Sequence, residues 1–208
     1  MTDQPEVIDL PRPFVSGGLP LVETIAQRRS IRDFTAAPVL LFHLAQILWA
    51  AQGITLTSNQ TRAVPSAGAT YPLEIYVVIG DNGIEKTSSG IYHYEVERHI
   101  LSLHFSGDFR PELSSAAMGQ DSIAVAPVSI VICAVYDRTM IRYNVRGERY
   151  VFMEVGHTGQ NIYLQATALN LGTVAIGAFR DDEVRKVLRL ESKFRPLYIM
   201  PVGKPVTS

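Results

Sequence analysis

With 208 residues, 47% of them hydrophobic and 19% charged, the chain has the composition of a folded globular protein, not of a disordered or fibrous one. A formal net charge of -1, without a run of like charges, gives it no basic face for binding nucleic acid. Cys133 is the one cysteine, which excludes an intrachain disulfide, and its place in the apolar run 128–135 predicts a small buried hydrophobe instead of a catalytic thiol.

Residues 1–18 are predicted to form an extended N-terminal arm. They contain Pro5, Pro11, Pro13 and the pair Gly17-Gly18, and proline removes a backbone donor and disfavours helix at the residue before it. Such an arm either wraps a neighbouring subunit or frays from its own. Residues 19–208 contain no long polar or Gly/Ser-rich linker, so we expect a single domain there.

The sequence gives no sign of a membrane or secreted protein. The first ten residues lack the apolar core of a secretory signal, and no stretch is long and apolar enough to cross a bilayer. We therefore expect a cytoplasmic protein with no membrane partner.

Apolar residues at helical spacing predict five helices. The first covers residues 21–29, and the second begins at Thr35 or Pro38 and ends at Gly53, which is well placed as a stop. Shorter helices are expected at 111–118 and 181–188. The longest covers residues 148–171 with Gly172 as its stop; Gly156 and Gly159 within it would let another helix approach closely, in the domain centre or at a dimer seam.

Runs rich in β-branched and aromatic residues predict the strands, with a hairpin formed by the second and third of them. They cover residues 73–80, 90–94, 100–105, 128–136, 173–176 and 197–202. Because these strands do not alternate regularly with the helices, the predicted fold class is α+β, with layers of helix and sheet. No GxGxxG, GxxxxGK[ST], HExxH or GxSxG motif is present, so Rossmann dinucleotide binding, metal-dependent hydrolysis and serine hydrolysis have no support.

The first segment that could carry chemistry follows the first predicted helix. Arg28, Arg29, Ser30 and Arg32 can surround a phosphate group with charge-assisted hydrogen bonds. Basic residues also favour the carboxyl ends of helices, because they interact well with the helix dipole. Both interpretations remain open from the residues alone.

The second segment is a loop of small residues between two prolines, Pro65-Ser66-Ala67-Gly68-Ala69-Thr70-Tyr71-Pro72. A rigid loop with such small side chains lets the backbone approach a flat ligand closely. The alternative is an ordinary turn that leads into the strand at residue 73. The side chains are smaller than a turn requires, which favours a ligand wall.

The third segment, 174–179, is a strand end followed by a turn at Gly177. Free backbone N–H groups of Ile176, Gly177 and Ala178 could donate to a heteroatom of a ring. By itself the segment is equally typical of a core strand that ends in a glycine turn.

Taken together and in order, these segments resemble the flavin nitroreductases, and most closely the subgroup that includes the SagB/ThcOx-type dehydrogenases. The resemblance covers nearly the whole chain. The matching stretches are Leu10-Pro11-Arg12-Pro13, Arg28-Arg29-Ser30-Ile31-Arg32, residues 48–55, residues 62–68, Gly90-Ile91-Tyr92-His93-Tyr94, residues 149–161 and residues 201–205.

The resemblance implies a nitroreductase-like sandwich, in which a central, mostly antiparallel sheet is flanked by helices and two intertwined subunits hold FMN at their interface. By position, Arg28, Arg29, Ser30 and Arg32 would bind the FMN phosphate and ribityl chain. The loop Pro65, Ser66, Ala67 and Gly68 of the other subunit would line the isoalloxazine ring. Ile176, Gly177 and Ala178 would place backbone donors near its reactive edge, and Lys204 would reach the phosphate.

The sequence departs from the better-known nitroreductases in three places. Gly68-Ala69 stands where many of them carry an asparagine, and Gly177 where some have a glutamate beside the flavin. A basic phosphate contact that some members have near the C-terminus has no counterpart before Ser208, so Lys204 would serve alone.

The activity implied by this resemblance is hydride transfer from NAD(P)H, through the flavin N5, to a small organic acceptor. Because the flavin carries the chemistry, no catalytic side chain is required, and we expect Glu154, His157 and Asn161, on one side of the long helix, to form a buried polar network. One alternative is a SagB/ThcOx-type dehydrogenase that oxidises azoline rings of a modified peptide, with Tyr143 or Tyr150 available as the base. Another is a flavin-binding dimer without turnover.

Overall fold

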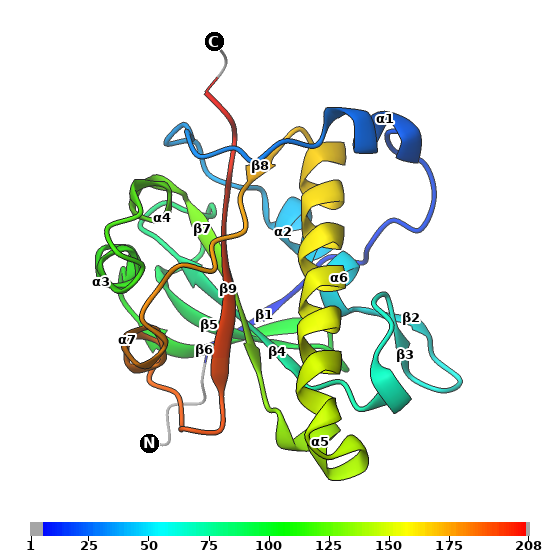
Figure 1. The fold of residues 1–208 in the computed structure, drawn as a ribbon. Coiled ribbons are helices and arrows are strands. Elements are labelled where there is room, and N and C mark those ends of the chain that lie inside the picture. The colour runs from blue at the N-terminus through cyan, green and yellow to red at the C-terminus, as the bar shows by residue number, and fades with distance from the viewer. Residues whose placement is uncertain (1–5, 207–208) are drawn as a thin grey trace.

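The centre of the molecule is a seven-stranded sheet, which is followed in strand order β1-β6-β5-β4-β7-β9-β8 (Figure 1). The computed structural model describes residues 6–206. All neighbouring strands of this sheet pair antiparallel. The strands are β1 Val7–Asp9, β4 Leu73–Ile79, β5 Gly90–Glu95, β6 Ile100–Ser106, β7 Val128–Ala134, β8 Gly172–Thr173 and β9 Arg195–Gly203.

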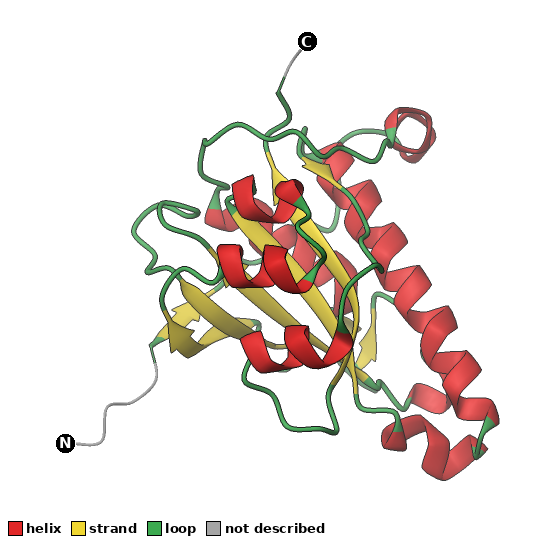
Figure 2. Ribbon diagram, turned by 60° about the vertical axis from the view of Figure 1, so that its left-hand side comes forward, coloured by secondary structure: helices red, strands yellow, loops and turns green. Residues whose placement is uncertain are grey.

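Helices cover both faces of the sheet, so the fold is a three-layer α+β sandwich (Figures 1 and 2). On one face lie α2 (Leu41–Gln52) and α6 (Arg146–Ala168), which pack against each other. On the other face lie three short helices, α3 (Arg110–Ala116), α4 (Asp121–Val125) and α7 (Asp181–Val187). This arrangement confirms the predicted α+β class and the mostly antiparallel sheet.

The two central strands are largely apolar, with Glu74 in β4 and Ser129 in β7 as exceptions, because each strand contributes to two cores. In β4, Leu73, Ile75 and Val77 belong to the core under α2 and α6, whereas Tyr76 and Val78 belong to the core under the short helices. Successive side chains of a strand point to opposite faces, so a strand covered on both sides is hydrophobic at most of its positions. Cys133 in β7 is fully buried in the second core, where burial raises the pKa of its thiol, in agreement with the predicted structural role.

The N-terminal segment packs against its own subunit. β1 pairs with β6 at the sheet edge. Further along, the backbone of Phe14 donates to Gln46 Oε1 in α2 at 2.8 Å and accepts from Gln46 Nε2 at 3.1 Å. Residues 1–5 of the predicted arm lie outside the described residues.

The helix α6 ends earlier than predicted, and Gly172 is not its stop. It ends at Ala168, and Asn170 adopts the left-handed conformation, with φ at 57°, that closes the helix. Leu171 N–H then donates to Ala166 O at 2.8 Å. Gly172 instead lies in β8, where a Cβ would come within 2.7 Å of Ile31, so the glycine is needed for close approach of two backbone segments.

Other boundaries and short elements differ from the predictions. The second helix begins at Leu41 and not at Thr35 or Pro38, because Leu40 is still extended, with φ at -67° and ψ at 136°. Thr35 and Val39 donate their N–H groups to Lys204 and Gly83 in other segments. Sequence patterns also did not predict α4, the helix α5 (Asp137–Tyr143), the hairpin of β2 (Ile54–Leu56) and β3 (Thr61–Arg62), or the 3-10 turn Ala67–Ala69. The first helix, α1, covers Leu21–Gln27. No helix of the described residues is long and apolar enough to cross a bilayer.

Candidate functional site

The arginine-rich segment after α1 lies along the end of the sheet. Ser30 forms a parallel bridge with Thr173, and Ile31 N–H donates to Thr173 O at 2.9 Å. Further on, Phe34 bridges Pro205, and Thr35 N–H donates to Lys204 O at 2.9 Å. The backbone pairing thus brings Lys204 and the segment 28–32, far apart in sequence, to one end of the sheet.

Tyr163 of α6 connects this segment with the third candidate segment. Its hydroxyl lies 3.0 Å from Ser30 Oγ and accepts the N–H of Ala175 at 2.7 Å. The guanidinium of Arg28 lies over the Tyr163 ring, 5.1 Å from its centre, a distance at which cation–π attraction acts. Tyr163 was not predicted as a site residue, since no motif in the sequence marks a contact that depends on how α6 packs against β8.

The three arginines of this segment and the neighbouring Lys204 have no acidic partner within the described residues. Arg28, Arg29, Arg32 and Lys204 take part in none of the ion pairs found there. Arg29 does bind the carbonyls of Ala26 and Arg28, at 2.9 and 2.8 Å, which is the helix-end role that its position also suggested. Arg28, Arg32 and Lys204 are therefore the cations that remain for an anionic ligand.

The third segment offers fewer donors than the sequence suggested. Ile176 N–H donates to Ile199 O at 2.9 Å and is therefore engaged in the sheet. Gly177 and Ala178 are exposed, and their N–H groups make no hydrogen bond to any residue between 6 and 206. The prediction of a free donor at Ile176 is therefore wrong. Of the three predicted donors, Gly177 and Ala178 remain.

The loop of small residues is held by its own residue Tyr71 and by α5, the helix that precedes α6. Ser66 Oγ accepts Tyr71 N–H at 2.9 Å, and Gly68 O accepts from the Arg142 guanidinium in α5 at 3.0 Å. Gly68 has φ at 59°, and a Cβ there would lie 2.6 Å from the Tyr143 hydroxyl. The left-handed backbone favours glycine at this position, and a Cβ would displace the ends of the Tyr143 and Arg142 side chains.

Within one chain the loop and the arginines do not meet. The loop lies beside Glu154, whereas Ser30 is bonded to Tyr163. These two α6 residues are nine positions apart, which corresponds to about 13 Å along the helix axis. One subunit therefore contains two separate halves of the predicted site.

The expected polar network of Glu154, His157 and Asn161 is wrong in its membership. His157 is exposed, and Asn161 Nδ2 donates to Ala50 O in α2 at 2.9 Å. Glu154 is 3% exposed and lies beside Ser66, Arg62 and Gln52 instead. Glu154 and Asn161 both point toward the body of the molecule but contact different groups, whereas His157 lies on the solvent side of α6.

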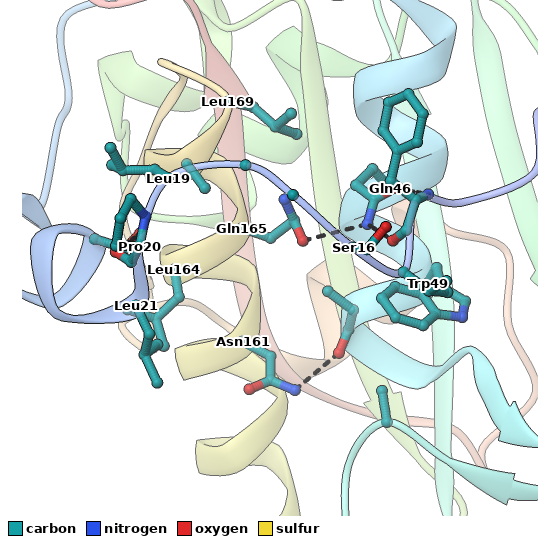
Figure 3. A pocket seen from close by; sticks show the side chains of 18 of the residues that line it. Ser16, Leu19, Pro20, Leu21, Gln46, Trp49, Asn161, Leu164, Gln165 and Leu169 are labelled. Atoms are coloured by element: carbon teal, nitrogen blue, oxygen red, sulfur yellow. Dashed lines mark hydrogen bonds between the residues drawn. The ribbon is translucent and has the colours of Figure 1, made fainter.

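A groove of about 780 Å³ runs between the N-terminal segment, α2 and α6 (Figure 3). Gln46 and Trp49 of α2 face Asn161 and Gln165 of α6 across it, and Leu19 to Leu21 close one side. Gln46 Nε2 donates to Gln165 Oε1 at 3.4 Å. None of the site residues predicted from the sequence lines this groove.

Comparison with known proteins gives several related proteins. The chain is 46% identical over 187 residues to a Methanocaldococcus jannaschii protein named as a nitroreductase, and the matched region covers 89% of this chain and 91% of that protein. It is 26% identical over 146 residues to the microcin B17-processing protein McbC of Escherichia coli, covering 68% of this chain and 54% of McbC. A solved Ralstonia eutropha structure, described as that of a nitroreductase, superposes with a TM-score of 0.85 at 27% identity, over 97% of this chain and 90% of that one.

The family model of the nitroreductases matches residues 25–204. That range contains the arginine segment, the Ser66 loop, the Gly177 turn and Lys204. The resemblance inferred from the sequence is thereby confirmed, and the likeness to McbC agrees with the SagB/ThcOx-type subgroup. The chain belongs to the nitroreductase family, a family of oxidoreductases.

Proposed function

We propose that two copies of this chain bind FMN at their interface and form an oxidoreductase that transfers hydride between NAD(P)H and a small organic acceptor. The observation that carries the proposal is the group of cations without acidic partners, Arg28, Arg32 and Lys204, at the end of the sheet beside Ser30 and Tyr163. A solved Vibrio harveyi neighbour is named as an NADPH:FMN oxidoreductase.

The residues present fit a phosphorylated flavin. Arg28, Arg32 and Lys204 would neutralise a phosphate, and the Ser30 hydroxyl would add a hydrogen bond. The N–H groups of Gly177 and Ala178 are free to donate to the edge of a ring, where they would stabilise negative charge. Bound FMN would supply the hydride-accepting atom, N5, and the protein would supply position and electrostatics.

A dimer would join the two half-sites that one chain keeps apart. The Ser66 loop of one subunit would then cover the ring of a flavin whose phosphate is held by the other subunit. Apolar side chains exposed on two regions support such an interface. They are Leu21, Val22 and Ile25 in α1, and Ile141, Val145, Phe152 and Met153 in and between α5 and α6.

The first test is the cofactor itself. Purified protein, reconstituted with FMN, should show the flavin absorption spectrum, and anaerobic NADH or NADPH should bleach it. The variant Arg28→Ala with Arg32→Ala should bind FMN roughly 100-fold more weakly, since two charge-assisted contacts are lost. Arg98→Ala with Arg185→Ala, two arginines that pair with their own acids, should bind FMN as the wild type does.

Three results would count against the proposal. Folded wild-type protein that takes up no FMN would refute flavin binding, and full retention of FMN by Arg28→Ala with Arg32→Ala would refute the phosphate site. Bound flavin that neither nicotinamide reduces would refute the NAD(P)H link and favour a flavin-binding dimer without turnover.

A second candidate function is dehydrogenation of azoline rings in a modified peptide. It is favoured by the likeness to McbC, of which this chain spans about half, and by the place of Tyr143, whose hydroxyl lies against the Ser66 loop at Gly68. A proton must leave carbon in that reaction, and Tyr143 would be the base nearest the loop. Conversion of an azoline peptide to the azole, with loss of two hydrogens seen by mass spectrometry and abolished by Tyr143→Phe, would decide for this function.

A further inference from the structure

Glu154 is the buried acid of α6, and it lies beneath the Ser66 loop. It is 3% exposed, and its Oε1 is buried without a hydrogen-bond partner in the part of the chain that the structure describes. The groups beside the carboxyl come from three other segments: Ser66 from the loop, Gln52 from the end of α2 and Arg62 from β3. An acid in this position calls for an explanation, because a buried carboxylate needs donors for both oxygens.

Arg62 is the charged group that acts on this carboxyl, but its guanidinium is already bound elsewhere. Its Nη1 donates to Gln52 Oε1 at 3.1 Å, and its Nη2 lies 3.2 Å from Glu97 Oε1. The guanidinium also lies over the Tyr71 ring, 4.5 Å from its centre. A carboxylate at position 154 would therefore lack a dedicated cation in a buried place, which favours the neutral acid.

A neutral acid needs an acceptor for its O–H, and Ser66 is the group placed to accept it. Gln52 stands beside the carboxyl as a donor, because its amide turns Nε2, which also donates to Thr158 Oγ1 at 3.1 Å, toward α6 and directs its Oε1 to Arg62. Ser66 Oγ accepts Tyr71 N–H and has a second lone pair open. With both lone pairs used, the hydroxyl hydrogen of Ser66 must point away from the network.

We propose that Glu154 is a positioning residue: as a neutral acid it donates its O–H to Ser66 Oγ, and this leaves the Ser66 hydroxyl free to donate outward to a ligand held at the Ser66–Gly68 loop. When Glu154 loses its proton, the hydroxyl turns inward to donate to the carboxylate, and the ligand loses a hydrogen bond. The inference rests on the proposed function only in taking that ligand to be a flavin.

Burial raises the pKa of Glu154 to about 7, against the opposing influence of Ser66, Arg62 and Gln52. The change of state would therefore fall near neutral pH. On its own helix the polar positions one turn from Glu154 are Tyr150, His157 and Thr158, of which His157 is exposed. Glu97 affects the Glu154 carboxyl only indirectly, through its ion pair with Arg62.

The first experiment uses the protein without ligand. Infrared spectra should show the carbonyl stretch of a neutral carboxylic acid at about pH 5, and the band should disappear by about pH 9 with a midpoint near 7. Glu154→Gln should lack the titrating band, and Glu112→Gln, at an exposed position in α3, should keep it. Wild-type protein without such a band, or with one that Glu154→Gln retains, would overturn the inference.

The second experiment measures the dissociation constant of FMN against pH. Because FMN itself titrates, the informative quantity is the ratio between Glu154→Gln and wild type, in which that titration cancels. The Gln side chain donates at every pH, so the two proteins should bind alike below pH 7, and wild type should bind about five-fold more weakly above it, the effect of one hydrogen bond. A ratio that does not change with pH would show a purely structural role and overturn the inference.

Ser66→Ala provides the independent variant, which also serves if Glu154→Gln does not fold. Removing the acceptor should shift the carbonyl band to higher frequency and weaken FMN binding about five-fold at low pH, with little effect at high pH. An unshifted band in Ser66→Ala would contradict the inferred hydrogen bond. If no variant and no wild-type sample binds FMN, the proposed function fails, but the infrared result still decides the state of Glu154.

Discussion

At the scale of single residues, the buried carboxyl of Glu154 links stability to pH. Its pKa rises from an ordinary 4.5 to about 7 on folding, so between these pH values the unfolded chain has released a proton that the folded chain still holds. The unfolded state binds fewer protons there, and the free energy of unfolding therefore falls as the pH rises from 4.5 to 7. Below pH 4.5 the acid is neutral in both the folded and the unfolded state, so the free energy of unfolding is not reduced by its ionisation.

We expect Glu154→Gln to remove this part of the pH dependence. Relative to wild type, the variant should gain on the order of 3 kcal/mol of unfolding free energy between pH 4 and pH 8, from a shift of about 2.5 units. Urea unfolding at a series of pH values measures the difference, with Glu112→Gln as the exposed control. A constant difference between Glu154→Gln and wild type across the series would mean that the carboxyl is already ionised in the folded protein.

Residue patterns predicted the composition of the site better than its contacts. Arg28, Ser30 and Lys204 were identified from residue type and from resemblance, and the structure brings them to one end of the sheet. Tyr163, which bonds Ser30 and Ala175, could not be found from the sequence because its partners lie in segments whose pairing is fixed only by the tertiary fold. The predicted partners of Glu154, His157 and Asn161, were wrong for the same reason.

At the scale of elements, α6 presents different surfaces to different neighbours, and its two glycines serve two of them. A Cβ at Gly159 would lie 3.2 Å from the Tyr198 ring, so this glycine admits a side chain of β9. Gly156 has nothing within 4 Å and lies on the exposed side with Phe152 and Met153, which are 50% and 52% exposed. That exposed side is the part of α6 suited to a second subunit.

We expect Phe152→Glu with Met153→Glu to weaken the proposed dimer at least about 100-fold, because apolar burial is lost and two charges would have to be desolvated. Light scattering coupled to size-exclusion chromatography, at decreasing protein concentration, would show dissociation. Met118→Glu, at an exposed methionine next to α3 in the opposite layer, is the matched control and should leave the mass unchanged. A dimer of wild-type affinity in Phe152→Glu with Met153→Glu would place the interface elsewhere.

Long periodic elements were predictable and short ones were not. α2, α6, β4 and β7 carry enough apolar residues at a regular spacing to be read from the sequence, although their ends shifted by a few residues. α4 and the strands β2 and β3 have two to five residues each, too few to establish a period. The strand predicted at 173–176 overlaps β8 only at Thr173. β1 forms because its backbone pairs with that of β6 at the edge of the sheet, and this pairing cannot be predicted from the residues of β1 alone.

At the scale of the whole molecule, the separation of the two half-sites along α6 leads to a test of how the subunits share the cofactor. If Arg28 and Arg32 of one chain act with the Ser66 loop of the other, a chain defective in either half can still contribute its intact half. The first partner is Arg28→Ala with Arg32→Ala. The second is Ala67→Phe, whose ring would block the flat surface of the loop.

Each variant alone should bind FMN at least about 100-fold more weakly than wild type, so that neither is loaded at FMN concentrations that saturate wild-type sites. After unfolding and refolding together in equal amounts, half of the dimers should be mixed, and each mixed dimer has one site with both halves intact, so about a quarter of all sites should bind FMN with wild-type affinity. Fluorescence titration counts these sites, and circular dichroism of each variant alone confirms that it folds. If both halves of a site came from the same chain, mixing would restore nothing, because each chain would carry its own defect into every site that it forms.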